Sequence, residues 1–144
     1  MKKSFFILTA IILIVTFMAL GFILQKRSNQ DEIKAYNKNY EYYLNKNVYG
    51  TEVATLINKV VESNERNNVP KDDNGYYIDN NTNSIKIDIK MITIEKTYPM
   101  ELIHNSNIEN FVKNFNVILF KCTNIEYHKQ TGKVSKLVFE QIEK

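Results

Sequence analysis

The chain has 144 residues, of which 44% are hydrophobic, and its 19 basic and 16 acidic side chains give a formal net charge of +3. The basic residues do not gather with aromatic residues along one segment, which argues against nucleic acid as a partner. A single cysteine excludes an internal disulfide framework. This length accommodates one ordinary domain and an additional segment.

The additional segment lies at the start of the chain. Residues 4–25 contain no charged side chain, and basic pairs flank them at positions 2–3 and 26–27. A helix needs about 20 apolar residues to cross a hydrocarbon core of about 30 Å. Residues 1–25 are therefore predicted to form a single-pass membrane anchor.

A cleaved secretory signal is the alternative for this segment. Residues 19–21, Ala-Leu-Gly, resemble the small-residue cleavage site of such signals. The apolar run is longer than a signal core, however, and continues through residues 22–24. A short basic start before a long apolar run is typical of a signal-anchor, so we expect the globular domain outside the cytoplasm and the protein in the cell membrane.

Residues 26–48 are predicted to continue the anchor as an amphipathic stalk helix. Large side chains recur there at spacings of three, four and three, which places them on one helical stripe: Ile33, Tyr36, Tyr40 and Tyr43. Two interpretations remain open. The stripe packs on the protein's own domain, or it contacts a helix of a protein partner or of a second copy of the chain.

The stalk is expected to turn a corner before a second helix. Asn45, Asn47 and Gly50 favour a helix end, because asparagine and glycine enter the left-handed conformation at low cost. Thr51 is predicted to cap the second helix, with Glu52 in its first turn. A core-facing stripe follows, consisting of Val53, Leu56, Ile57, Val60 and Val61.

A sheet is predicted after this helix, beginning with a short strand at residues 76–79. The segment "SIKIDIKM" at 84–91 then alternates apolar and polar residues. The apolar parity changes at Ile92 and Ile94, so the strand is expected to end near Met91.

Short helices are expected at residues 99–102 and 106–115, the second capped by Ser106. Strands at 117–128 and 133–142 are joined by "KQTG", where Gly132 suits a hairpin turn. Residues 49–144 are thus predicted to form an α+β domain with the second helix packed on an antiparallel sheet of about four strands. The expected core is Val53, Leu56, Ile57, Val60, Ile85, Ile87, Ile89, Phe111, Phe115, Leu119 and Phe139.

Catalytic and metal-binding patterns are weak in this sequence. Cys122 and His128 fall on one predicted strand, roughly 20 Å apart at about 3.3 Å per residue, which is too far for a nucleophile and its base. The acidic and amide residues of 72–83 do not match a calcium loop and are typical of turns. We therefore expect no catalytic residues, no cofactor and no metal.

An apolar helix that continues as a stalk and packs on a sheet resembles the pilin-like architecture. Residues 49–60, "YGTEVATLINKV", also look like the segment after the membrane helix in small proteins of Tad-type pilus systems. The chain is similar as well to many single-pass envelope proteins of low-GC Gram-positive bacteria. This resemblance implies an accessory component of a pilus-like or secretion assembly.

Two functions follow from these observations. The first is a non-enzymatic, membrane-anchored envelope protein that acts through protein contacts. The second is an anchored extracytoplasmic binding or sensor domain that takes a small ligand or peptide on the sheet face or edge.

Overall fold

The computed structural model describes residues 2–92 and 95–142, and the chain divides into two compact units, residues 1–35 and 36–144. The boundary lies between Ala35 and Tyr36, inside the segment 26–48 that the sequence predicts as a stalk. The second half of that segment therefore belongs to the globular domain, not to a separate stalk.

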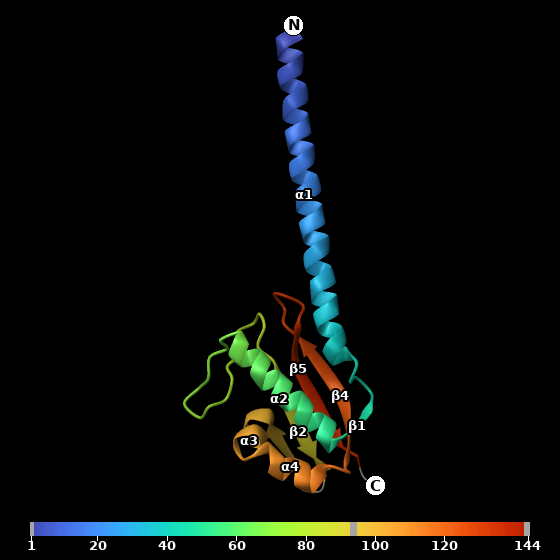
Figure 1. Cartoon of the computed structure of the whole chain (residues 1–144), viewed down its shortest axis with the longest axis vertical. Helices are drawn as coiled ribbons and strands as arrows, with labels where there is room; N and C mark the ends of the chain where they lie inside the picture. The colour runs from blue at the N-terminus through green and yellow to red at the C-terminus, as the bar shows by residue number, and fades with distance from the viewer. Residues whose placement is uncertain (1, 93–94, 143–144) are drawn as a thin grey trace. The chain divides into compact units, whose positions relative to one another are not determined.

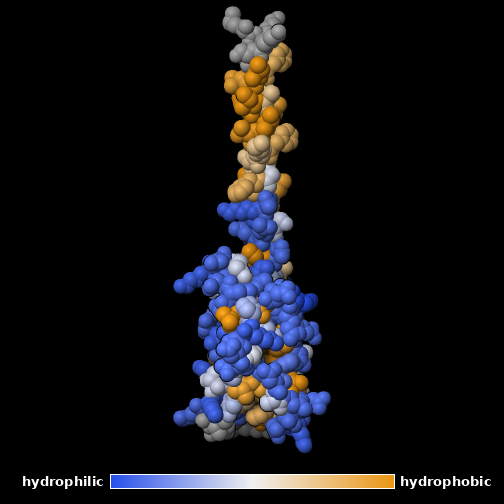
Figure 2. Space-filling view, turned by 90° about the vertical axis from the view of Figure 1, so that its left-hand side faces the viewer, coloured by the Kyte–Doolittle hydropathy of each residue, from blue (hydrophilic) through white to orange (hydrophobic). Residues whose placement is uncertain are grey.

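Helix α1 spans Lys2–Glu41 and provides the first unit (Figure 1). Among the described residues it is the one helix long and apolar enough to cross a membrane, by length and composition. Figure 2 shows its apolar residues as a nearly continuous hydrophobic surface. The hydroxyls of Thr9 and Thr16 donate to the carbonyls of Phe6 and Ile12, so the helix itself satisfies these polar groups, as lipid would require.

Within the described residues of the domain, five strands form one sheet in the order β1-β4-β5-β2-β3. In chain order, they span Asn47–Tyr49, Lys86–Met91, Lys96–Pro99, Leu119–Tyr127 and Val134–Gln141. Strands β2 and β5 run parallel, and the other neighbours are antiparallel. The α+β class is confirmed, and the described sheet has five strands where about four were expected; only the expectation of purely antiparallel pairing is wrong, because β2 and β5 are parallel. Parallel pairing needs a long crossover, which here contains β3, α3, α4 and β4.

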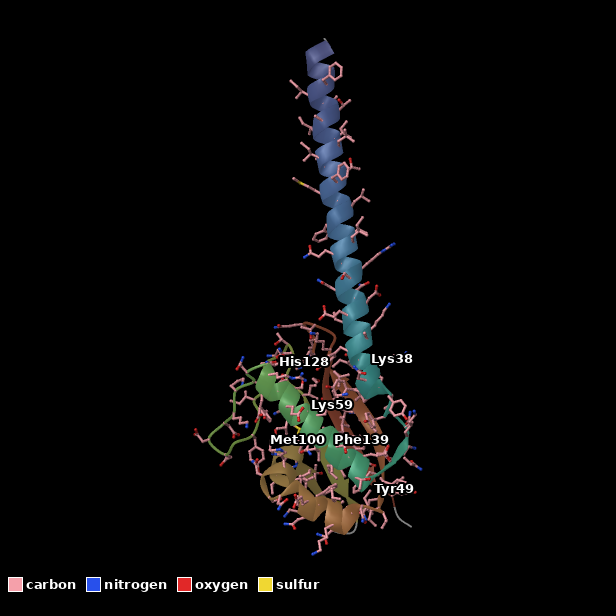
Figure 3. The ribbon with its side chains drawn as sticks, viewed as in Figure 1. Lys38, Tyr49, Lys59, Met100, His128 and Phe139 are labelled. Carbon is pink, nitrogen blue, oxygen red and sulfur yellow. The ribbon has the colours of Figure 1, made fainter. Side chains whose placement is uncertain are left out.

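Three helices cover one face of this sheet (Figure 1): α2 at Gly50–Arg66, α3 at Met100–Asn105 and α4 at Ile108–Phe115. The predicted stripe of α2 is buried, and Figure 3 labels Phe139 of β5 behind this helix. Of the predicted core, Phe115 and Leu119 are only half-buried, and the remainder is buried.

The corner before α2 differs from the prediction in its mechanism. Asn45 takes the left-handed conformation, with φ 60°, and its N–H donates to the carbonyl of Cys122. Gly50 is instead the buried first residue of α2. A Cβ at this position would lie 2.1 Å from the carbonyl oxygen of Phe115. Gly50 is therefore required for the close approach of two helices and not for a turn.

Thr51 does not cap α2, so that prediction is wrong. The helix begins one residue earlier, with Tyr49 at the N-cap. The Glu52 carboxylate, in the first turn of the helix, accepts a hydrogen bond of 3.0 Å from the Tyr49 N–H. The backbone N–H of the N-cap residue therefore has a partner. The carbonyl of Thr51 accepts from the hydroxyl of Thr55.

Two further local predictions also need correction. Residues 76–79 form no strand, and only a single bridge joins Lys71 to Tyr77. Helix α4 is capped by Asn107, not by Ser106, because the Asn107 side chain accepts a bond of 2.9 Å from the Glu109 N–H.

The remaining strand predictions are confirmed. Strand β2 alternates as expected and ends at Met91, whereas Ile94 lies outside the described residues. Strands β4 and β5 form a hairpin in which Gly132 has a φ of 71°.

Candidate functional site: a pocket beside the edge strand

The tyrosine stripe at the end of α1 packs into the domain's own core. Tyr40 is only 3% exposed, and Tyr36 and Tyr43 are partly buried against the same core. The rings of Tyr43 and Phe139 meet edge to face, with centroids 6.2 Å apart. Burial is the main cause that raises the pKa of all three phenols. Of the two interpretations of the stripe, packing on the protein's own domain therefore holds for Tyr36, Tyr40 and Tyr43, while Ile33 belongs to the first unit.

Asn37 is a positioning residue that the sequence analysis missed. It is 7% exposed, and its side-chain amide donates to the Gly132 carbonyl at 2.8 Å. Its side-chain oxygen accepts from the Val134 N–H at 2.9 Å. These bonds fasten the last turns of α1 to the β4–β5 hairpin. Asn37 and Asn39 both lie between Tyr36 and Tyr40, and nothing in the sequence distinguishes the asparagine that has this role.

Cys122 is a fully buried thiol in β4. Burial raises its pKa to about 11, and its Sγ donates to the Asn124 carbonyl at 3.7 Å. A thiol in this environment carries almost no thiolate at neutral pH and is a poor nucleophile.

Ser84, His128 and Asp79 lie together near the β4–β5 turn, where Figure 3 labels His128. The arrangement is not that of a catalytic nucleophile hydrogen-bonded to its base. Nε2 of the buried His128 donates to the Ser84 carbonyl at 2.7 Å, since a carbonyl can only accept. The Ser84 hydroxyl donates to Asp79 at 3.0 Å instead of facing the imidazole. These bonds close the 79–84 loop over the hairpin, so the cluster is structural.

The turn carboxylates also act on the backbone. Asp72 accepts from the N–H groups of Asn74 and Tyr76, and Asp79 accepts from that of Asn81. The bond from Asn81, followed by the Ser84 and His128 interactions, lowers the pKa of Asp79. Within residues 2–92 and 95–142, no group of three or more His, Cys, Asp or Glu side chains is arranged to hold a metal.

The sheet face opposite the helices carries charges of both signs. Lys90 pairs with Glu140 at 2.7 Å, and Lys136 pairs with Asp88 at the same distance. The hydrogen bond from Lys90 lowers the pKa of Glu140, and the hydrogen bond to Asp88 raises the pKa of Lys136. Interspersed cross-strand pairs of this kind are typical of a solvated face, which makes it a poor surface for a ligand.

A pocket of about 250 Å³ lies at the β3 edge of the sheet, beside helices α3 and α4. Its apolar walls come from four separate elements: Met91, Tyr98, Leu102, Ile103, Phe111 and Phe115. Its polar residues lie between α3 and α4 or on α4: Ser106, Asn107, Asn110 and Asn114. All the described lining side chains are uncharged.

The asparagines of the pocket offer donors and acceptors without charge. Asn107 uses its side-chain oxygen to cap α4, and Asn114 uses its amide to donate to the Asn110 carbonyl at 2.8 Å. The amide of Asn107 and the side-chain oxygen of Asn114 lie outside these two bonds. Apolar walls with a few convergent polar groups are the usual composition of a binding site.

The size of the pocket limits what it can hold. Pockets for complete small molecules usually measure about 300–1,000 Å³. A volume of about 250 Å³ suits a small apolar group or one part of a larger ligand. The lining residues all fall within residues 91–115, but they come from two strands and two helices, and the sequence does not show how those elements pack together.

Comparisons of the chain with models of protein families, with characterised proteins and with solved structures find no match. The resemblance to pilin-like proteins stays a prediction.

Proposed function

We propose that this protein is a single-pass, non-enzymatic binding protein of the cell membrane, with a domain outside the cytoplasm that takes a small ligand or a peptide in the pocket between β3 and α3–α4. The pocket is the observation that carries the proposal. It combines an apolar floor, an uncharged polar rim and a position at a sheet edge.

Anchoring is supported by α1, whose apolar part has the length and composition of a membrane span. The basic pairs at positions 2–3 and 26–27 flank that part. The short basic start supports a domain outside the cytoplasm.

A binding role is supported over catalysis by the environments of the reactive side chains. The Cys122 thiol is buried with a raised pKa. The imidazole of His128 and the hydroxyl of Ser84 are buried and engaged in loop contacts.

An accessory role in a pilus-like or secretion assembly has less support than the sequence suggests. The resemblance to pilin-like proteins implied that role, and a tyrosine stripe free to contact another protein would have supported it. Tyr36, Tyr40 and Tyr43 instead pack against the domain's core.

The four methionines of the chain provide a direct test. Met91 lines the pocket, Met100 is fully buried outside its lining, and Met18 lies in the apolar part of α1. The full chain would be labelled with ¹³C-methyl methionine and placed in lipid nanodiscs. N-acetyl-phenylalaninamide and N-acetyl-leucinamide serve as uncharged probes, and Met91→Leu assigns the pocket methyl.

We expect saturable shifts of the Met91 methyl and none of the Met18 methyl. Leu102→Glu places a charge at the pocket and should abolish these shifts. Val117→Glu, at an exposed position outside the pocket lining, is the matched control and should preserve them. An unchanged Met91 methyl at millimolar concentrations of both probes would contradict the proposal.

A further inference from the structure

Within the described residues, 2–92 and 95–142, strand β3 has a free edge next to the pocket. It is the last strand in the sheet order and pairs with β2 on one side only, over four residues. Alternate residues of an edge strand direct their N–H and C=O groups outward. Pro99, at its end, has no N–H and is tolerated at such an edge.

The pocket lies where the side chains of an additional strand would point. Tyr98 is directly opposite Ile89 in the β2–β3 ladder, so both side chains project from the same sheet face. Ile89 is buried on the helix-covered face, and Tyr98 lines the pocket. A segment paired with β3 would therefore direct every second side chain toward the helix layer, at the pocket.

Apolar side chains are exposed on both sides of β3 in the sequence. Ile92, shortly before the strand, is 41% exposed, and Leu102, in the helix that follows it, is 43% exposed. Leu102 is part of the pocket lining, whereas Ile92 lines a separate hollow with Lys90 and Glu140. The pocket lining itself suits uncharged, apolar side chains.

We infer that the ligand is an extended peptide segment that pairs with the free edge of β3 and inserts an uncharged apolar side chain into the pocket. This inference rests on the proposed binding function and specifies its ligand. The backbone pairing supplies affinity that is independent of sequence, and the pocket supplies the preference for an apolar side chain. A pocket that holds one part of a larger ligand agrees with its volume of about 250 Å³.

A second copy of the chain is a poorer occupant of this edge. Self-pairing would use the short segment Lys96–Pro99 twice. Short length, lysine and proline at an edge all weaken pairing with another strand. In self-pairing both strands would carry Lys96 and Pro99, whereas a peptide can supply a longer strand without a charge or a proline.

The test uses the full chain in nanodiscs and end-blocked hexapeptides in which serine alternates with leucine or phenylalanine. Each peptide carries a C-terminal fluorescein, and binding is followed by fluorescence anisotropy. Two modified forms are compared, with N-methyl groups on the odd-numbered or on the even-numbered amides. Pairing with β3 uses only one of these two sets.

We expect methylation of one set to weaken binding about tenfold or more, and methylation of the other set to weaken it less than about threefold, since each lost hydrogen bond costs about 1 kcal/mol. Leu102→Glu should abolish binding, while Val117→Glu should preserve it. Equal effects of the two methylation sets would overturn strand addition.

The small probes distinguish failure of the inferred peptide pairing from failure of the proposed binding function. A shifted Met91 methyl with N-acetyl-phenylalaninamide, without any peptide binding, would overturn the inference and leave the proposed function standing. Failure of both the small probes and the peptides would overturn both. Concentration-dependent self-association of the chain that is lost in Thr97→Pro would identify a second copy as the occupant and would also overturn the inference.

Discussion

Replacing Gly50 with alanine tests how closely α2 and α4 approach each other. The added methyl group would lie 2.1 Å from the carbonyl oxygen of Phe115 and 2.8 Å from its carbonyl carbon. Favourable contacts between carbon atoms lie at about 3.5–4.0 Å. Both neighbouring atoms belong to the backbone, so no side-chain rotation can relieve the overlap, and one helix end must move by more than about 1 Å.

The expected magnitude follows from two opposing effects. Overpacking a buried contact costs about 1–3 kcal/mol, whereas alanine in place of glycine favours a helix by at most about 1 kcal/mol. Because the overlap at 2.1 Å is with backbone atoms, we expect a cost in the upper half of the overpacking range, so Gly50→Ala should lower the free energy of unfolding by about 1–2 kcal/mol after the helix gain is subtracted. Because Phe115 also lines the pocket, the same substitution should weaken probe binding.

Urea unfolding of the full chain in a mild detergent, followed by the near-ultraviolet circular dichroism of its tyrosines, measures this loss. Gly132→Asn is the control, since Gly132 faces open space and its φ of 71° is one that asparagine tolerates. The control should stay within about 0.5 kcal/mol of the wild type. If Gly50→Ala is as stable as this control, the close helix contact is not a constraint on the fold.

Three other perturbations test the core and its boundary. Leu56→Ala should cost about 2–5 kcal/mol in the same unfolding assay, because this side chain is 1% exposed, and a loss below about 0.5 kcal/mol would contradict its packing. A fragment of residues 36–144 should be more stable than a fragment of residues 46–144 by at least about 3 kcal/mol, because the shorter fragment lacks the buried Tyr40. Equal stability of the two fragments would show that the end of α1 is dispensable. With a pKa of about 11, the Cys122 thiol should be about one part in a thousand thiolate at pH 8. Iodoacetamide should therefore modify it in 8 M urea and not in the folded chain, and mass spectrometry measures the difference.

The sequence predicts those elements whose pattern is long and regular. The apolar run of α1, the stripe that includes Leu56 and the alternation of β2 each repeat several times, and each is found. Strands β1 and β3 have three and four residues, too few for a periodic signal. Their positions follow from tertiary pairing, which local patterns do not encode.

The lining of the candidate pocket is even harder to predict from the sequence than these short strands. Met91 is correctly predicted at the end of a strand, and Phe111 in a helix, but neither pattern states that the two side chains share a pocket with Tyr98. The tyrosine stripe is also instructive. Its spacing identifies a helix face, and only the fold decides that Tyr40 faces the core and not another protein.

The position of β5 has a consequence for biosynthesis. This strand lies between β4 and β2 in the sheet, yet Val134–Gln141 follows all the other described strands in the chain. Until β5 is present, no strand joins the β2–β3 pair to β4 in the sheet. The Asn37 side chain also lacks its hydrogen-bond partners, the Gly132 carbonyl and the Val134 N–H. The five-stranded sheet can therefore close only after β5 has been synthesised, and until then β1–β4 and β2–β3 are separate strand pairs.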